Sequence, residues 1–178
     1  MRVFKTEGII IKRKNFGEAD RILTVFTKRH GKIKIIAKGV RKITSRRSSH
    51  VELLNLSVMG VHEGKIPVLT EAESLNHHSN LKNDLRKTGY AFYICELIDG
   101  MLAEHQENRA VFELLEQTLF ELEIVKDPRP LIRKFEEEML ILLGFWPKDK
   151  IFLEDSDMFI EGVLERRIKT KRILPDFS

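Results

Sequence analysis

The chain has 178 residues, of which 42% are hydrophobic and 33% charged, and its single cysteine is Cys95. This composition can bury the core of one compact domain or of two small ones. It excludes an internal disulfide and a zinc site built from several cysteines, because both need more than one cysteine. No apolar run approaches the roughly 20 residues of a membrane-spanning helix, so we expect no membrane segment, a cytoplasmic protein and a buried, structural Cys95 thiol.

The net charge of +4 hides an uneven distribution of charged residues. Residues 1–50 carry +12, residues 51–80 carry −3, residues 81–160 carry −7 and the remainder carries +2. The most basic stretch, Lys28 to Arg47, contains no acidic residue. Such a segment either binds a polyanion or forms a solvated basic face, and nucleic acid is the polyanion that we favour.

The N-terminal part of the sequence has the pattern of a β domain. Up to about Asn76 it alternates with period two, is rich in β-branched residues and has turn residues between the runs. The pattern predicts strands within residues 7–14, 20–27, 32–38, 53–63 and 67–75. Gly17 and Gly31 lie in the first two connections and can take positive φ. We therefore expect a small closed or half-closed barrel whose first three strands form an antiparallel meander.

Alternation also assigns the two faces of the predicted strands. The third strand places its apolar residues on one side: Ile33, Ile35 and Ala37. It places its lysines on the other side: Lys32, Lys34 and Lys38. The fourth strand groups Leu54, Leu56 and Val58. One face should be core, and the other should be wet and positive.

After Asn76 the hydrophobic period changes to 3.6, which is typical of amphipathic helices. A stripe over residues 81–102 predicts one helix or a kinked pair, with Gly89 as its weak point. Asn108 is the predicted N-cap of a second helix, whose stripe covers residues 111–122. Together the two stripes predict the beginning of a helical bundle.

A third helix should begin at Pro130 and end at Gly144. Its acidic run, residues 136–138, is expected on the solvated face of this helix. Beyond Ile151 the sequence mixes both periods, and the last residues should fray. The fold class is therefore α+β, with a five-stranded barrel followed by a helical domain.

Catalysis finds little support in the sequence. The motifs GxxxxGK[ST], GxGxxG, HExxH and GxSxG are all missing, and the six histidines are scattered. The acidic run at residues 136–138 would need convergent geometry to act as a pair of catalytic acids. We expect no catalytic residue, no metal and no cofactor.

The basic stretch supplies the candidate site. Its residues could line a groove beside the phosphates of a nucleic acid strand: Lys32, Lys34, Lys38, Arg41, Lys42, Arg46 and Arg47. Arg13 and Lys14, at the first hairpin, are weaker candidates. Neutralising six to ten phosphates would cost a factor of about 10³ to 10⁵ in affinity between 50 and 200 mM salt. The first 80 residues hold only three aromatic residues, Phe4, Phe16 and Phe26, so binding should depend on the backbone and on salt.

The stretch KTEGIIIKRKNFGEADRILTVFTKRHGKIKIIAKGVRK resembles the N-terminal signature of the bacterial RecO family of recombination mediators. In that family a TEGIVL-like strand, a GE-D-R-I hairpin, a T-HGKI turn and an AKG-R segment occur in this order. The later segments PVLTEAE, YAFYICELID and RKFEEEMLILLGFWP are also similar to the family. The resemblance covers about residues 3 to 147.

The resemblance implies an OB-fold nucleic-acid-binding domain at residues 1–78 and a helical domain at residues 79–178. It implies a DNA repair role at the bacterial nucleoid, with binding of single- and double-stranded DNA and annealing of complementary strands. The implied partners are RecR, the C-terminal tail of single-strand DNA-binding protein and, indirectly, the RecA recombinase. Many relatives carry a four-cysteine zinc module where this sequence reads KDKIFLEDSDMFIEG, so we expect a shorter form without that module.

Two alternatives stay open at this point. The basic loop could bind acidic tails of partner proteins, with the chain acting as a protein-interaction adaptor. The chain could also be an RNA-binding OB-fold protein, because an RNA strand would be attracted by the same positive charge.

Overall fold

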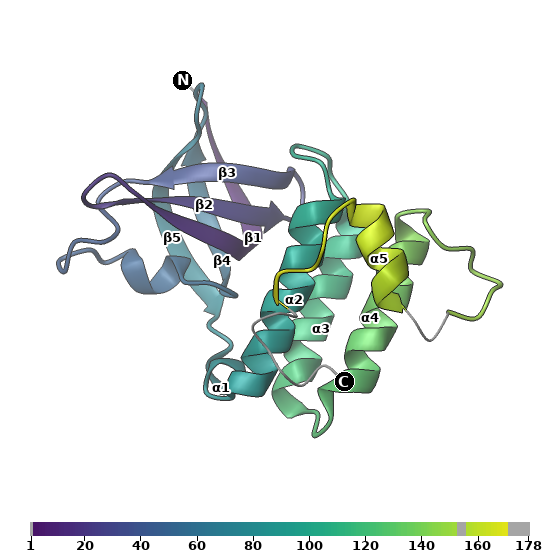
Figure 1. Ribbon diagram of the computed structural model, residues 1–178. Helices are drawn as coiled ribbons and strands as arrows, with labels where there is room; N and C mark the ends of the chain where they lie inside the picture. Colours follow the sequence, from purple (N-terminus) through teal and green to yellow (C-terminus); the bar gives the residue numbers. More distant parts are fainter. Residues whose placement is uncertain (1, 153–155, 171–178) are drawn as a thin grey trace. The chain divides into compact units, whose positions relative to one another are not determined.

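The computed structural model describes residues 2–152 and 156–170 (Figure 1). The chain forms two compact units. The first contains Met1–His78 and Leu102–Phe112, and the second contains Ser79–Met101 and Glu113–Ser178. The first unit is built from strands and the second from helices.

The five strands of the first unit close into a barrel in the order β1-β2-β3-β5-β4. They are β1 (Val3–Phe16), β2 (Asp20–Thr27), β3 (Gly31–Ala37), β4 (Leu56–His62) and β5 (Val68–Asn76). All neighbouring strands are antiparallel except β3 and β5, which are parallel. This is the OB-fold arrangement, and it confirms the predicted five strands and the meander of the first three.

The barrel core confirms one predicted face and corrects another. Ile33, Ile35 and Ala37 of β3 are buried in it, as expected. In β4 the residues of the barrel core are Met59 and Val61, so the expected grouping of Leu54, Leu56 and Val58 on that core is wrong, although Leu54 and Leu56 are buried outside it and Val58 is half-buried. Both alternating sets of this strand are apolar, so alternation could not choose between them, and pairing with β1 and β5 sets the register.

Lys32 does not lie on a wet face, contrary to expectation. Its side chain is buried, with 6% of the residue exposed. The connection that follows Met101 pairs with the start of β3: Lys32 forms a parallel bridge with Glu104, and the Lys32 carbonyl accepts a hydrogen bond from His105 at 2.9 Å. This connection lies about 70 residues away in the sequence, so strand alternation alone could not reveal the cover over Lys32.

The two connection glycines have the expected left-handed conformation, with φ of 56° at Gly17 and 66° at Gly31. Their surroundings differ. A Cβ atom at Gly31 would lie 2.3 Å from the backbone oxygen of Gln106, whereas a Cβ atom at Gly17 would meet nothing within 4 Å. Gly31 is therefore required both by its φ and by the close approach of another backbone segment.

Gly31→Ala should destabilise the first unit by about 2–4 kcal/mol, because the methyl group adds a backbone clash to the strain of positive φ. Gly17→Ala is the matched control, since it carries only the conformational cost of about 1–2 kcal/mol. Urea denaturation of both variants measures the difference. Equal destabilisation would contradict the close packing of Gln106 on Gly31.

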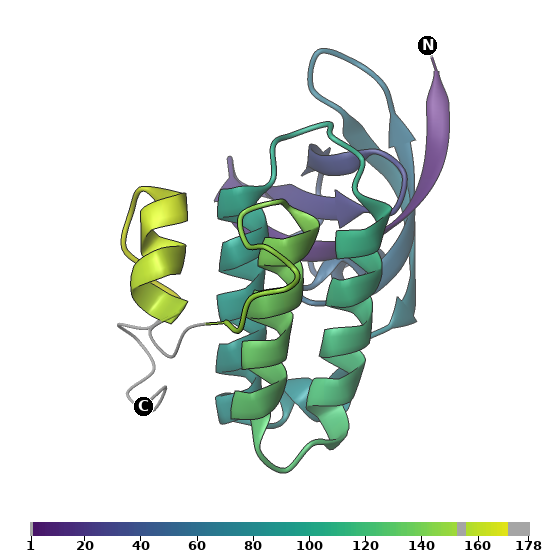
Figure 2. The same ribbon diagram turned by 90° about the vertical axis from the view of Figure 1, so that its right-hand side faces the viewer.

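The second unit contains helices α1 (Ser79–Lys82), α2 (Leu85–Met101), α4 (Pro128–Leu142), α5 (Ser156–Leu164) and most of α3 (Arg109–Ile124). Figure 2 shows α2, α3 and α4 side by side, with α5 next to α2. In the described part of the chain, no helix is long and apolar enough to cross a membrane. The expected fraying of the last residues, 171–178, lies outside the described residues.

The break in the first helical segment lies at Asn83 and Asp84, so the expected weak point at Gly89 is wrong. Asp84 begins α2, because its side-chain oxygen accepts a hydrogen bond from the Lys87 N–H at 3.0 Å. Gly89 is buried within an unbroken helix. Here the polar cap, and not the glycine, determines where the helix starts.

The predicted cap of α3 is confirmed, since the Asn108 side chain accepts a hydrogen bond from the Val111 N–H at 3.1 Å. Helix α4 begins two residues earlier than expected, at Pro128. The preceding Asp127 is its N-cap and accepts a hydrogen bond from the Arg129 N–H at 3.2 Å. The stop at Gly144 agrees with the prediction, because the Gly144 N–H bonds back to Ile141 at 3.0 Å.

Glu136 is buried with 4% exposure, which corrects its expected place on a solvated face. Its carboxylate accepts hydrogen bonds from the Tyr93 hydroxyl at 2.5 Å and from the Ser156 hydroxyl at 3.1 Å. Burial and the nearby Glu136 charge raise the pKa of Tyr93, so the phenol stays a donor. The predicted burial of Cys95 is confirmed, and burial raises the pKa of its thiol to about 12.

Glu96 on α2 holds the segment that follows α5. Its carboxylate accepts hydrogen bonds from the Arg166 guanidinium at 2.6 Å, from the Lys169 N–H at 2.8 Å and from the Thr170 N–H at 2.9 Å. Burial by itself would raise the pKa of Glu96. The hydrogen bonds outweigh this effect and lower the pKa to about 2.

We expect the contribution of Glu96 to stability to depend on pH. Because its pKa falls from 4.5 to about 2 on folding, the contribution is complete above 4.5 and is lost as the pH falls towards 2. The difference in unfolding free energy between the native chain and Glu96→Gln should therefore be constant above about pH 5 and shrink below it. Urea denaturation at several pH values measures this, and a difference that does not change with pH would contradict the assignment.

Candidate nucleic-acid interface

The basic loop, defined here as residues 38–47, follows β3 and carries five basic residues and no acid. It is folded into tight turns. The Lys42 N–H donates to the Gly39 carbonyl at 3.1 Å, and the Ser45 N–H donates to the Lys42 carbonyl at 2.9 Å. The loop therefore has a defined backbone conformation before any ligand arrives.

The connection between β1 and β2 fixes one side of the basic loop. The Asp20 carboxylate accepts a hydrogen bond from the Gly39 N–H at 2.7 Å, and the Ala19 carbonyl accepts one from the Arg41 N–H at 2.9 Å. The Arg41 guanidinium also donates to the Gly17 carbonyl at 3.2 Å. Two connections that are distant in the sequence thus form one surface.

Arg47 fixes the other side of the loop. Its guanidinium donates to the Lys38 carbonyl at 2.8 Å and to the Leu69 carbonyl of β5 at 2.9 Å. The planar guanidinium has five N–H groups and can serve several carbonyls together. Arg47, one of the predicted phosphate ligands, therefore joins the start of the loop, its end and β5.

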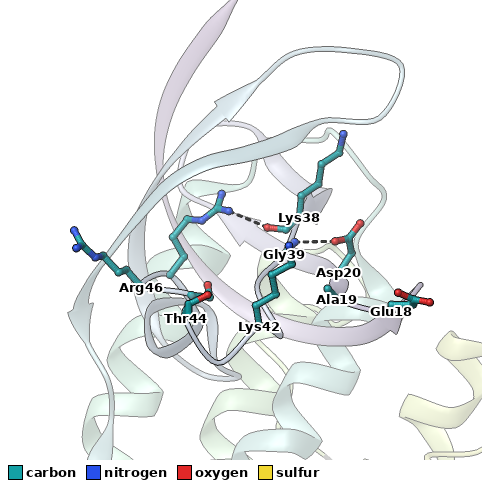
Figure 3. A pocket seen from close by; sticks show the side chains of 10 residues that line it. Glu18, Ala19, Asp20, Lys38, Gly39, Lys42, Thr44 and Arg46 are labelled. Carbon is teal, nitrogen blue, oxygen red and sulfur yellow. Dashed lines mark hydrogen bonds between the residues drawn. The ribbon is translucent and has the colours of Figure 1, made fainter.

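An open hollow of about 850 Å³ lies between the loop and the β1–β2 connection. Its lining residues are Glu18, Ala19, Asp20, Lys38, Gly39, Lys42, Thr44, Ser45, Arg46 and Arg47. Figure 3 shows Glu18 and Asp20 at one rim and Arg46 at the opposite rim. The Ser45 hydroxyl oxygen is buried without a hydrogen-bond partner in the described part of the chain, so a ligand oxygen there would satisfy a group that is costly to leave unpaired.

Three of the predicted residues, Lys38, Lys42 and Arg46, are exposed on this surface. Among residues 2–152 and 156–170, their side chains have no hydrogen bond or ion pair. Exposed cations of this kind can contact phosphates without first losing a protein partner.

The predicted strand lysines have a different environment. Lys34 has an exposed side chain, but its ammonium lies 2.5 Å from the Glu104 carboxylate. This hydrogen bond holds the pKa of Glu104 below its ordinary value. Along an extended strand Lys34 lies about 13 Å from Lys38, so the structure separates Lys32 and Lys34 from the exposed cations of the loop.

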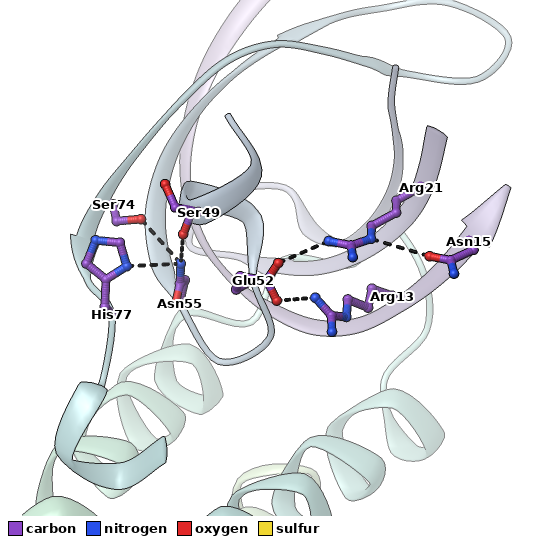
Figure 4. A network of polar contacts seen from close by, with 8 residues as sticks. All are labelled: Arg13, Asn15, Arg21, Ser49, Glu52, Asn55, Ser74 and His77. Atoms are coloured by element: carbon purple, nitrogen blue, oxygen red, sulfur yellow. Dashed lines mark hydrogen bonds and ion pairs between the residues drawn. The ribbon is translucent and has the colours of Figure 1, made fainter. Parts of the chain in front are cut away.

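At the first hairpin, Arg13 and Arg21 share the carboxylate of Glu52 (Figure 4). The Arg21 guanidinium lies 3.0 Å from it. Asn55, which is buried, donates to the Ser49 carbonyl at 2.8 Å and so holds the segment that carries Glu52. The charge of Arg13 is therefore compensated by a neighbour, whereas the side chain of Lys14 is exposed.

The sequence did not reveal the acidic residues that pair with some of these basic residues and position others. Glu52 and Glu104 pair with predicted ligands, and Asp20 positions the loop backbone. The only available signal was the GE-D-R-I hairpin of the family resemblance, which contains Glu18 and has Asp20 at the start of the predicted strand 20–27. No three histidine, cysteine or carboxylate side chains converge as metal ligands in the described residues.

Two family models match the chain and together span most of it. The model for the N-terminal part of recombination protein O matches residues 1–78, and the model for its C-terminal part matches residues 82–148. The chain belongs to the recombination protein O family. The basic loop lies within the N-terminal match, and Glu96 and Glu136 lie within the C-terminal match.

Several members of the recombination protein O family are similar to the chain over most of its length. The DNA repair protein RecO of Dehalococcoides mccartyi is 39% identical over 146 residues, which cover 82% of this chain and 58% of the relative. The RecO proteins of Roseiflexus sp. and Listeria welshimeri are 34% and 33% identical and cover 83% and 80% of the chain. The aligned segments cover only 52% and 56% of those two relatives, so the chain spans little more than half the length of the RecO proteins it matches.

The different roles of neighbouring arginines give a direct prediction. Arg47→Ala should lower the unfolding free energy of the barrel by about 1–3 kcal/mol, because three backbone carbonyls lose a charged donor. Arg46→Ala removes the same charge from an exposed side chain and should change it by less than about 0.5 kcal/mol. Thermal or urea denaturation separates the two, and equal effects would contradict the assignment of Arg47.

Proposed function

We propose that this chain is a DNA repair and recombination mediator that binds single- and double-stranded DNA through the basic loop. Residues 1–78 would be the nucleic-acid-binding domain and residues 79–178 the helical domain. The observation that carries the proposal is the arrangement of Lys38, Lys42 and Arg46, exposed together on a hydrogen-bonded loop of an OB-fold barrel. Membership of a family whose relatives are called DNA repair proteins supports it.

A preformed loop suits this role because little conformational entropy is lost when it meets a strand. Arg41 adds a fourth cation, since only part of its guanidinium is used by the Gly17 carbonyl. Three or four phosphate contacts on a single strand would give a salt slope of about −2 to −3, so affinity would fall about 20- to 60-fold between 50 and 200 mM salt. This is weaker than the dependence expected from the full set of basic residues, because Lys34 and Arg13 have acidic partners.

The family resemblance extends the proposal to a non-enzymatic reaction, the annealing of complementary strands. Contacts to phosphates hold a strand without covering its bases, so the bases remain able to pair. In this proposal the chain acts with RecR to load RecA onto DNA coated by single-strand DNA-binding protein, and it engages the acidic tail of that protein. The proposal requires no cofactor.

The decisive variant is the triple change Lys38→Ala/Lys42→Ala/Arg46→Ala. Removing three phosphate contacts should reduce the salt slope of oligo(dT) binding by about 2 and leave stability unchanged. The matched control is Lys126→Ala/Lys148→Ala/Lys150→Ala, which removes three exposed positive charges from the second unit. Fluorescence anisotropy over a series of salt concentrations measures both slopes, and the same slope for the triple variant and the native chain would refute the proposal.

The same variants should differ in annealing activity when they are tested with complementary strands coated by single-strand DNA-binding protein. The native chain and the control should anneal the strands, and the loop variant should not. An RNA strand of matched sequence serves as a second substrate. Clearly tighter binding to RNA, or annealing that is independent of the loop, would contradict the DNA repair role.

A further inference from the structure

Ile43 is the most exposed large hydrophobic residue in the described part of the chain, with a relative accessibility of 104%. It lies in the basic loop between Lys42 and Thr44. A single exposed aliphatic side chain is common on protein surfaces. The position of Ile43, its neighbours and the rigidity of its loop distinguish it from such a residue.

The first distinguishing feature is that Ile43 is held outward. The residues on both sides of it take part in turn hydrogen bonds, Lys42 to Gly39 and Ser45 to Lys42. Behind these turns, Asp20 of β2 and the bond from Arg47 to the Leu69 carbonyl of β5 fix the loop to the barrel. Ile43 therefore cannot reach the barrel core unless these bonds break.

The second feature is the charge around Ile43. Lys42 precedes it directly, and Arg41 and Arg46 lie within three residues. An apolar protein surface is a poor partner, because these cations would lose water without gaining an opposite charge. A nucleic acid strand offers both required groups, since its phosphates are anionic and the faces of its bases are apolar.

We propose that Ile43 is a base-contacting wedge, which packs against the face of a base while the surrounding cations hold the phosphates. This inference rests on the proposed function and adds a second kind of contact to it. Apolar side chains of this type insert between base steps in other nucleic-acid-binding proteins. In a single strand the bases are already unpaired, so the contact costs less energy than it would in a duplex.

A base wedge also adds an apolar base contact to a barrel whose phenylalanines offer a single half-exposed ring. Of its three phenylalanines, Phe26 is fully buried and Phe4 is packed against the core, so neither offers an open face for stacking. Phe16 is half exposed, at the end of β1. An aliphatic contact at the loop would keep a base separated from its neighbours and ready to pair.

The test compares two ligands of equal length and charge, oligo(dT) and an abasic deoxyribose-phosphate strand. The native chain should bind oligo(dT) about five- to tenfold more tightly, because only that strand has bases for Ile43 to contact. Ile43→Ser should lose most of this preference while its affinity for the abasic strand and its salt slope stay unchanged. Ile124→Ser, which alters an exposed isoleucine of the second unit, should behave like the native chain.

A second readout uses fluorescence. Trp146 is the only tryptophan of the chain, so in Ile43→Trp/Trp146→Phe all tryptophan emission comes from position 43. Oligo(dT) should quench this emission and the abasic strand should not, because quenching needs contact with a base.

The outcomes separate the wedge from the proposed function. Equal affinity of the native chain for both strands, or no effect of Ile43→Ser, would overturn the wedge and leave DNA binding intact. Failure of the native chain to bind either strand would overturn both. If Ile43→Ser weakens binding to both strands equally, Ile43 supports the structure of the loop and does not contact a base, which would also overturn the wedge.

Discussion

The closure of the barrel between β3 and β5 is the constraint on which the basic loop depends. Ile36 pairs with Val68 there, and its N–H donates to the Pro67 carbonyl at 2.9 Å. In the barrel β5 lies between β3 and β4, although β4 comes before β5 in the sequence. A connection must therefore carry the chain from the end of β3 past the position of β5 to the start of β4. The basic loop begins that connection, and Arg47 fastens the end of the loop to Lys38, which directly follows β3, and to Leu69 of β5.

The basic residues of the barrel fall into two groups, those that pair with an acidic residue and those that do not. Where an acid is within reach, as for Arg13 and Lys34, the positive charge is compensated inside the protein. The acids at the rim of the loop hollow act differently: Asp20 accepts a hydrogen bond from the Gly39 N–H and, within the described residues, forms no ion pair with Lys38 or Lys42. The positive charge of the first 50 residues is thus concentrated in fewer exposed side chains than the sequence indicates.

Local patterns predicted those parts of the fold that local chemistry determines. Strand alternation gave the core face of β3, and the polar side chain of Asn108 gave the start of α3. The failures at Lys32 and Glu136 share a physical reason, since the burial of both residues depends on partners distant in the sequence. Lys32 is covered by the connection that carries Glu104, and Glu136 meets Tyr93 and Ser156.

The candidate site was predictable as a segment but not in its details. The run of cations identified the loop, whereas only the structure separates Arg47, which holds the loop, from Arg46, which is exposed. The most direct measurement is amide chemical-shift mapping by NMR with a short oligo(dT). We predict that the largest changes occur in residues 38–47 and in the adjoining residues 17–20. Changes confined to residues 79–101 and 113–152 would contradict it.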